Sequence, residues 1–152
     1  MKISEYFREE DCIMELKSKT KEEAIREIAE TLYKKGKIND MDKLISDILE
    51  REELGSTGIG HGIAIPHART EAVSDFVVGF GRSSRGIDFN SIDGEKVNLI
   101  FLMGANPNQL NLYLRLLAEL SKFLMNASCR KELMEAKDAS SVIEMVKRFE
   151  GS

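Results

Sequence analysis

The sequence predicts a layered α/β domain in which helices cover both faces of a central mixed sheet. Three observations predict this class. Four short apolar segments have the composition of buried strands, amphipathic helical segments lie before and after them, and both kinds of element need a partner layer to cover an apolar face. With 42% hydrophobic and 32% charged residues among 152, residues 1–152 suit a single domain that buries roughly two thirds of its unfolded surface.

The strand candidates span 12–16, 62–65, 76–81 and 97–103. The last two are rich in β-branched and aromatic residues, which pack well on a pleated and half-buried surface. Pro66 should end the 62–65 strand, because proline has no N–H for a central ladder. Residues 86–94 are expected to form a loop or a small hairpin.

Two helices are expected in the first third of the chain. The first follows Thr20, which opens a Thr20-Lys-Glu-Glu23 capping box, and Gly36 supplies its stop. The second follows Asp40 as its N-cap and carries Arg51 near its end. The apolar residues at helical spacing are Ala24, Ile25, Ile28, Ala29 and Leu32, then Met41, Leu44, Ile45, Ile48 and Leu49.

Three more helices are expected in the last third. Asn106-Pro107 predicts a helix start, with asparagine as the cap and proline in the first turn. The apolar residues that follow at helical spacing are Leu110, Tyr113, Leu114, Leu117, Leu120, Phe123 and Leu124. The other two helices span about 128–136 and begin near Ser141.

Charge and cysteine content exclude several classes of function. The net charge of -4 is spread along the chain without a dense basic cluster, so nucleic acid is not an expected partner. No run of roughly 18 apolar residues occurs, so direct membrane insertion is not expected and we place the chain in the cytoplasm. Cys12 and Cys129 lie far apart and outside any C-x-x-C pair, which favours reduced, buried thiols over a disulfide or a zinc site.

The chemistry is concentrated in residues 55–69, which hold both histidines of the chain. The glycines at 55, 58, 60 and 62 allow backbone N–H groups to converge on an anion, helped by the Ser56 and Thr57 hydroxyls. This spacing is not that of a nucleotide P-loop, since His61-Gly62 follows where lysine and Ser/Thr are required. A glycine-rich turn with a purely structural role is the alternative.

His67 directly follows Pro66, so it should project from a fixed point at the end of a strand, where ligand sites gather in open α/β sheets. An ordinary imidazole is largely neutral at cellular pH and can act as a nucleophile toward phosphorus or as a general base. A structural role for this histidine is the alternative.

These residues also carry a family resemblance. Arg51-Glu52, then Gly55-Ser-Thr-Gly-Ile-Gly60, then Gly62-Ile-Ala-Ile-Pro-His-Ala-Arg69 resemble the signature of the fructose/mannitol type enzyme IIA domains of the phosphoenolpyruvate-dependent phosphotransferase system, which include a nitrogen-regulatory subgroup. The resemblance extends over nearly the whole chain. It implies the mannitol-type IIA fold, a sandwich with a mixed sheet.

The resemblance implies that His67 accepts a phosphoryl group from the phosphohistidine of HPr or of its nitrogen-branch counterpart. His67 would then pass the group to a IIB domain or to a regulatory protein. Arg51 would stabilise phosphate charge, and Ser56, Thr57 and Gly58 would form the phosphate-binding loop. Arg51 could instead only complement the helix dipole. No metal, nucleotide or other cofactor is implied.

The sequence departs from the family pattern at Tyr113, which occupies the position of a second histidine. A phenol can donate a hydrogen bond to phosphate but cannot supply the positive charge of an imidazolium. Either Tyr113 keeps that hydrogen bond, or His61 compensates as an auxiliary group. The second alternative requires the glycines to fold the chain back, since six extended residues span about 20 Å.

Two functions are therefore expected, and a third is disfavoured. The first is a phosphoryl carrier with His67 as acceptor. The alternative is a regulatory binding module of the nitrogen-regulatory type, which controls partner proteins by its phosphorylation state without sugar transport. A hydrolase using Ser56, His61 and His67 is disfavoured, because the chain contains no G-x-S-x-G elbow and no common metal-ligand spacing.

Overall fold

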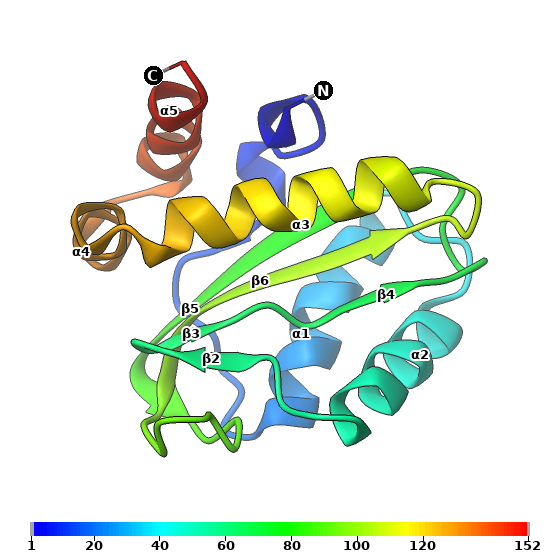
Figure 1. The fold of residues 1–152 in the computed structure, drawn as a ribbon, viewed down its shortest axis with the longest axis horizontal. Helices are drawn as coiled ribbons and strands as arrows, with labels where there is room; N and C mark the ends of the chain where they lie inside the picture. The colour runs from blue at the N-terminus through cyan, green and yellow to red at the C-terminus, as the bar shows by residue number, and fades with distance from the viewer. Residues whose placement is uncertain (1, 152) are drawn as a thin grey trace.

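The computed structural model describes residues 2–151, and it confirms a mixed sheet between two layers of helices (Figure 1). The strand order is β1-β5-β6-β3-β2, and β4 also pairs with β6. The elements are 3-10 helices η1 (Ile3–Glu5) and η2 (Glu9–Asp11), strands β1 (Cys12–Ile13), β2 (Gly58–Gly60), β3 (Ile63–Ala64), β4 (His67–Arg69), β5 (Val77–Ile87) and β6 (Val97–Ala105), and helices α1 (Lys21–Lys34), α2 (Met41–Glu53), α3 (Leu110–Met125), α4 (Ala127–Glu135) and α5 (Ala139–Glu150).

Strand β6 is the centre of the sheet. It pairs antiparallel with β5 on one side and parallel with β3 and β4 on the other. Its side chains alternate between the two apolar cores, as the period of a strand requires. Leu99, Phe101 and Met103 enter the core under α3, α4 and α5, while Ile100 and Leu102 enter the core under α1 and α2.

Helices α1 and α2 begin where the sequence predicts. The Thr20 hydroxyl accepts the N–H of Glu23 and the Glu23 carboxylate accepts the N–H of Thr20, which completes the capping box. The Asp40 carboxylate caps α2 by accepting the N–H of Lys43 at 3.0 Å. Every residue expected on the inner face of α1 is fully buried, and the α2 face is buried at Leu44, Ile45 and Ile48.

Several element boundaries differ from the prediction. Strand β1 covers only two residues of the expected 12–16 segment, whereas β5 continues well beyond the expected 76–81 segment and ends at Ile87, inside the start of the expected 86–94 loop or hairpin. Helix α3 begins at Leu110 with Gln109 as its N-cap position. Asn106 is not the cap because its side chain donates to the carbonyl of Val73 and accepts from the N–H of Asn108, which holds a turn before the helix.

The buried face of α3 also differs from the expected one. Leu116 is fully buried, while Leu110 and Leu114 are 42% and 53% exposed. Leucines lie on more than one side of this helix, so apolar spacing alone does not identify the inner face. The two C-terminal helices lie close to the expected ranges, with α4 starting after the Asn126 cap.

Both cysteines have free thiols and are partly exposed, so the expected burial is only partial. Burial, followed by the nearby charges of Asp11 and Glu9, raises the pKa of the Cys12 thiol to about 12. Within residues 2–151, no helix is long and apolar enough to cross a bilayer.

Glycines on β5 allow α1 to pack closely on the sheet. A Cβ atom at Gly79 would lie 2.8 Å from Ile28 and 3.2 Å from Leu32, and one at Gly81 would lie 2.8 Å from Ile28. Both contacts are with fully buried side chains of α1, so neither glycine position has room for a methyl group.

We expect Gly79→Ala to lower the free energy of unfolding by about 1–3 kcal/mol, because the added methyl group overpacks the core against Ile28. Urea unfolding followed by circular dichroism measures the change. Gly151→Ala is the matched control, since a Cβ there meets only backbone oxygens at 3.5 Å or more. Equal stability of the two variants would contradict the close packing of α1 on β5.

Candidate functional site

An open cleft lies between α2, strand β4 and the start of α3. Figure 1 shows these three elements on its right-hand side. The volume of the cleft is about 830 Å³. The lining residues include His67, Arg51, Arg69 and Tyr113. Within residues 2–151 β4 pairs only with β6, so its other edge has no strand beside it and the cleft opens along the edge of the sheet.

His67 is the first residue of β4. The preceding strand β3 ends at Ala64, before Pro66, as predicted. Pairing with β6 then resumes at His67: Ile63 pairs with Leu99 and His67 pairs with Met103, so the register along β6 is the same before and after the proline. The ladder loses the hydrogen bond that Pro66 cannot donate, but the Pro66 carbonyl still accepts the N–H of Met103 at 3.0 Å. His67 is thereby fixed in the sheet.

The ring of His67 is oriented by the carbonyl of Ile65, which lies 2.6 Å from Nδ1. A carbonyl only accepts, so Nδ1 carries the proton and, in the neutral ring, Nε2 carries the lone pair. Within residues 2–151 no hydrogen bond involves Nε2. The half-buried imidazole therefore has one nitrogen held by the backbone and one available to a ligand in the cleft.

The surroundings of His67 favour its neutral form. Burial is the largest cause that lowers the pKa of this imidazole below its ordinary value of 6.5, and the charge of Arg51 lowers it further. The hydrogen bond to Ile65 and the charge of Glu52 act in the opposite direction and only partly offset the lowering of the pKa. A neutral imidazole is the form that acts as a nucleophile.

Tyr113 lies beside His67, with ring centroids 5.8 Å apart and ring planes at 56°. Burial raises the pKa of the Tyr113 phenol to about 12, against the opposing charges of Arg51 and Arg69. The phenol is therefore neutral at physiological pH and can donate a hydrogen bond to an anion in the cleft.

Arg51 is on the last turn of α2, and its Nη1 donates to the carbonyl of Gly55 at 2.9 Å. This contact holds the guanidinium at the mouth of the cleft and leaves its remaining N–H groups unused by that bond. The structure brings together the three side chains expected at the reacting centre, which are His67, Arg51 and Tyr113.

The structure does not bring Ser56, Thr57 or Gly58 to this cleft. The Ser56 hydroxyl donates to the carbonyl of Phe89 and accepts the N–H of Gly58 at 2.9 Å. The Thr57 hydroxyl donates to Glu52. Both hydroxyls hold the loop in place here, and their contact with phosphate stays a prediction.

Sequence reasoning assigned no role to Glu52, which the structure places at the base of the loop. Glu52 is 8% exposed, and its carboxylate accepts the backbone N–H of Thr57 at 3.0 Å as well as the Thr57 hydroxyl. The Nζ atom of Lys21, on α1, forms an ion pair with the Glu52 carboxylate at 3.3 Å. Glu52 thereby joins the end of α2 to the segment that precedes β2, and its charge acts on the His67 ring to raise the pKa of that imidazole.

Arg69 and Thr70 were also not assigned a role. Arg69 lines the cleft as a second guanidinium, and the Thr70 hydroxyl donates to Asp47 at 2.6 Å and fixes the end of β4 to α2. The sequence signal that could have predicted a role for Arg69 was its spacing from His67. Two residues after His67 on a strand, it lies on the same side of the chain.

His61 lies far from His67. It occupies the turn between β2 and β3 with a φ of 58°, and its backbone N–H donates to Asp93. Ile63 and His67 pair with residues four apart on β6, which separates them by about 13 Å along the sheet. The chain does not fold back, so the structure does not bring His61 to the cleft that holds His67.

The fold and the cleft together define a class of protein: a layered α/β domain that presents one neutral imidazole, flanked by arginines and a neutral phenol, at an open sheet edge. Residues 5–149 match the family model "Phosphoenolpyruvate-dependent sugar phosphotransferase system, EIIA 2". The chain belongs to this family.

Similar proteins include sugar-specific and regulatory members. The chain is 39% identical over 150 residues to the fructose-specific EIIABC component of Bacillus subtilis, a match that covers 99% of this chain and 24% of that protein. It is also 30% identical over 146 residues to a nitrogen regulatory protein of Bradyrhizobium diazoefficiens, with 96% of this chain and 95% of that protein covered. The chain thus spans about a quarter of the first relative and nearly all of the second.

Solved structures confirm the mannitol-type fold. The nitrogen regulatory protein IIA-Ntr of Neisseria meningitidis has a TM-score of 0.88 at 27% identity, with 95% of this chain and 98% of that chain covered. Enzyme IIA-mannitol of Escherichia coli, in its complex with phosphorylated enzyme IIB-mannitol, has a TM-score of 0.79 at 26% identity, with 93% and 97% covered.

We expect the pKa of His67, measured by NMR titration of the ring carbons, to lie below 6.5, and Arg51→Gln to raise it by removing a nearby positive charge. Because the pKa of His67 is lower in the folded state than in the unfolded state, the unfolded state binds the proton first as the pH falls. The contribution of His67 to the free energy of unfolding therefore decreases as the pH falls from 6.5 toward the lowered pKa. Lys131→Gln, remote on α4, is the control. An unchanged or lower pKa in Arg51→Gln would contradict this electrostatic account.

Proposed function

We propose that this domain is a phosphoryl carrier in which His67 accepts a phosphoryl group from an HPr-type phosphohistidine. The observation that carries the proposal is the state of the His67 ring. Its pKa is lowered, its Nδ1 donates to the Ile65 carbonyl, and its Nε2 has no partner within residues 2–151. Family membership supports the same role.

The geometry supports Nε2 as the attacking atom. The Nε2 lone pair forms the new N–P bond while the N–P bond to the donor imidazole breaks, and the electron pair of that bond returns to the donor ring. The proton on Nδ1 of His67 stays in place during transfer, because the Ile65 carbonyl at 2.6 Å continues to accept it. The hydrogen bond to Ile65 also stabilises the positive charge that the ring acquires on phosphorylation.

Phosphoryl transfer depends on positioning and on charge stabilisation more than on covalent chemistry from the protein. In the proposed mechanism, Arg51 and Arg69 stabilise the equatorial oxygens, and the neutral Tyr113 hydroxyl donates one hydrogen bond to them. These three side chains come from α2, β4 and α3, so the cleft assembles the site from three separate elements.

The open edge of β4 supports transfer between proteins, because a second protein can bring its own phosphorylated or accepting residue to His67. The acceptor we propose is a IIB domain, in line with the complex formed by the mannitol relative. We also propose that the exchange takes place in the cytoplasm, where the phosphoenolpyruvate-dependent relay operates.

The second candidate is a regulatory module whose phosphorylation state controls partner proteins. The specific observation in its favour is the likeness to nitrogen regulatory proteins over nearly their full length. Retained partner binding by an unphosphorylatable His67 variant, without transfer to any IIB domain, distinguishes this function from sugar uptake.

Incubation with phosphoenolpyruvate, enzyme I and HPr is expected to add one acid-labile phosphoryl group, measured by intact mass. His67→Gln should abolish the addition, since glutamine has no nucleophilic imidazole nitrogen. His61→Asn is the matched control and should be labelled at the wild-type rate, because His61 lies outside the cleft. Labelling that persists in His67→Gln would falsify the assignment of the acceptor.

Tyr113→Phe should slow phosphoryl transfer to His67 about tenfold or more, because a hydrogen bond to a charged group contributes roughly 1.5–3 kcal/mol. Rapid-quench measurement of the single-turnover rate checks this expectation. Tyr113→His should restore or exceed the wild-type rate, since an imidazole also donates to phosphate. A wild-type rate in Tyr113→Phe would show that the phenol makes no contact in the transition state.

A further inference from the structure

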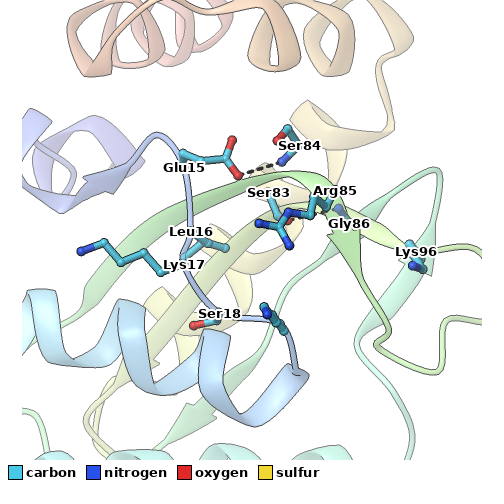
Figure 2. Close-up of a pocket in the computed structure, with 10 residues that line it drawn as sticks. Glu15, Leu16, Lys17, Ser18, Ser83, Ser84, Arg85, Gly86 and Lys96 are labelled. Atoms are coloured by element: carbon cyan, nitrogen blue, oxygen red, sulfur yellow. Dashed lines mark hydrogen bonds between the residues drawn. The ribbon is translucent and has the colours of Figure 1, made fainter.

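A second cleft lies on β5, around the segment that precedes α1, and no family residue discussed above belongs to it (Figure 2). It is a hollow of about 730 Å³. Its lining residues are Glu15, Leu16, Lys17, Ser18, Lys19, Ser83, Ser84, Arg85, Gly86 and Lys96.

A bulge in the backbone of β5 forms one wall of this hollow. Arg82 pairs with Leu99 and Ile87 with Val97, so five steps along β5 cover two along β6 and residues 83–86 bulge out of the ladder. Gly86 has a φ of +84°, and a Cβ there would lie 2.8 Å from the side chain of Lys96. Only glycine therefore allows the bulge to approach Lys96 so closely.

The other wall is the segment that leads from β1 to α1. It is tied to β5 at two points: the N–H of Leu16 donates to the carbonyl of Arg82 at 2.7 Å, and Thr20 forms a parallel bridge with Asp88. Between these points the segment is not paired with β5. The hollow is therefore fixed at both ends by backbone contacts.

The residues that line the hollow are mainly positively charged, whereas the chain as a whole is negatively charged. Four cations and one carboxylate line it, although the net charge of the protein is -4. Within residues 2–151 none of the four cations forms an ion pair within 4.0 Å. The nearby carboxylates bond backbone groups instead: Glu15 accepts the N–H of Ser84 at 3.1 Å, and Glu27 accepts the N–H groups of Lys17 and Ser18.

A buried hydroxyl adds to this set. Ser83 is 3% exposed, and its Oγ accepts the N–H of Gly86 at 3.1 Å. Within residues 2–151 its hydroxyl proton has no acceptor, so it is available to a ligand. Figure 2 shows Arg85 extending, in this view, between β5 and the 15–18 segment, whereas Lys17 extends away from it. We therefore take Arg85, Lys96, Lys19 and the Ser83 hydroxyl as the candidate anion-binding groups of the lining.

We propose that this hollow binds a small phosphorylated metabolite, with the phosphate held by Arg85, Lys96 and Lys19. Guanidinium and ammonium groups in a concave, carboxylate-poor site attract and hold phosphate oxygens. The lining contains no aromatic residue on which a base would stack, and its one apolar side chain, Leu16, is buried. A single-stranded nucleic acid and a lipid surface therefore both fit less well than a small anion.

The test is an NMR titration of the unphosphorylated protein with inorganic phosphate and with inorganic pyrophosphate at constant ionic strength. Saturable shifts are expected in the amides of residues 15–19 and 83–86, with pyrophosphate binding more tightly. Arg85→Gln/Lys96→Gln should weaken binding at least tenfold, while the control Lys131→Gln/Lys137→Gln, which removes two exposed lysines elsewhere, should leave it unchanged.

Shifts that do not saturate, that chloride reproduces at equal ionic strength, or that persist in Arg85→Gln/Lys96→Gln would overturn the proposal. Binding of anionic vesicles without any response to pyrophosphate would overturn it too. The amide spectrum reports whether each variant is folded, and Ser83→Ala provides a second test without a change of charge, with weaker binding expected. Because the readout needs no phosphoryl transfer, failure here is distinguishable from failure at His67.

Discussion

The pairing of β6 with strands on both of its edges is the constraint on which the rest of the structure depends. Strand β5 binds one edge, and β3 and β4 bind the other in one continuous register. This arrangement places alternate β6 side chains in two separate cores, so α1 and α2 are held on one face and α3, α4 and α5 on the other. The position of every cleft residue follows from these layers.

The interruption of pairing at Pro66 is what orients the His67 ring. A continuous strand would direct the Ile65 carbonyl into a ladder, but the break at residues 65–66 leaves that carbonyl to accept Nδ1 of His67. Because pairing resumes at His67 opposite Met103, the ring orientation is set by a local backbone contact inside a rigid sheet. The imidazole is therefore oriented before any ligand arrives, which lowers the entropic cost of reaction.

The sequence predicts the layers well because they depend on local signals: the capping box at Thr20, the Asp40 cap and the apolar composition of β5 and β6. It fails where nonlocal contacts decide. The side chain of Asn106 bonds Val73, far away in the chain, so the residue cannot cap α3. Likewise, Glu52 under the loop forms an ion pair with Lys21 of another helix, a contact that no spacing rule reveals.

At the candidate site, the residue types were predictable and their geometry was not. His67, Arg51 and Tyr113 meet in one cleft because α2, β4 and α3 converge there, whereas His61, six residues before His67 in the sequence, lies in the turn between β2 and β3 and outside the cleft. With a pKa of about 12, Tyr113 adds no charge at physiological pH, so in the proposed mechanism it donates one neutral hydrogen bond and only the arginines bring positive charge to the phosphoryl oxygens. A phosphohistidine with less cationic stabilisation is held less tightly. In the proposed mechanism, the tyrosine thus favours passing the phosphoryl group on over storing it.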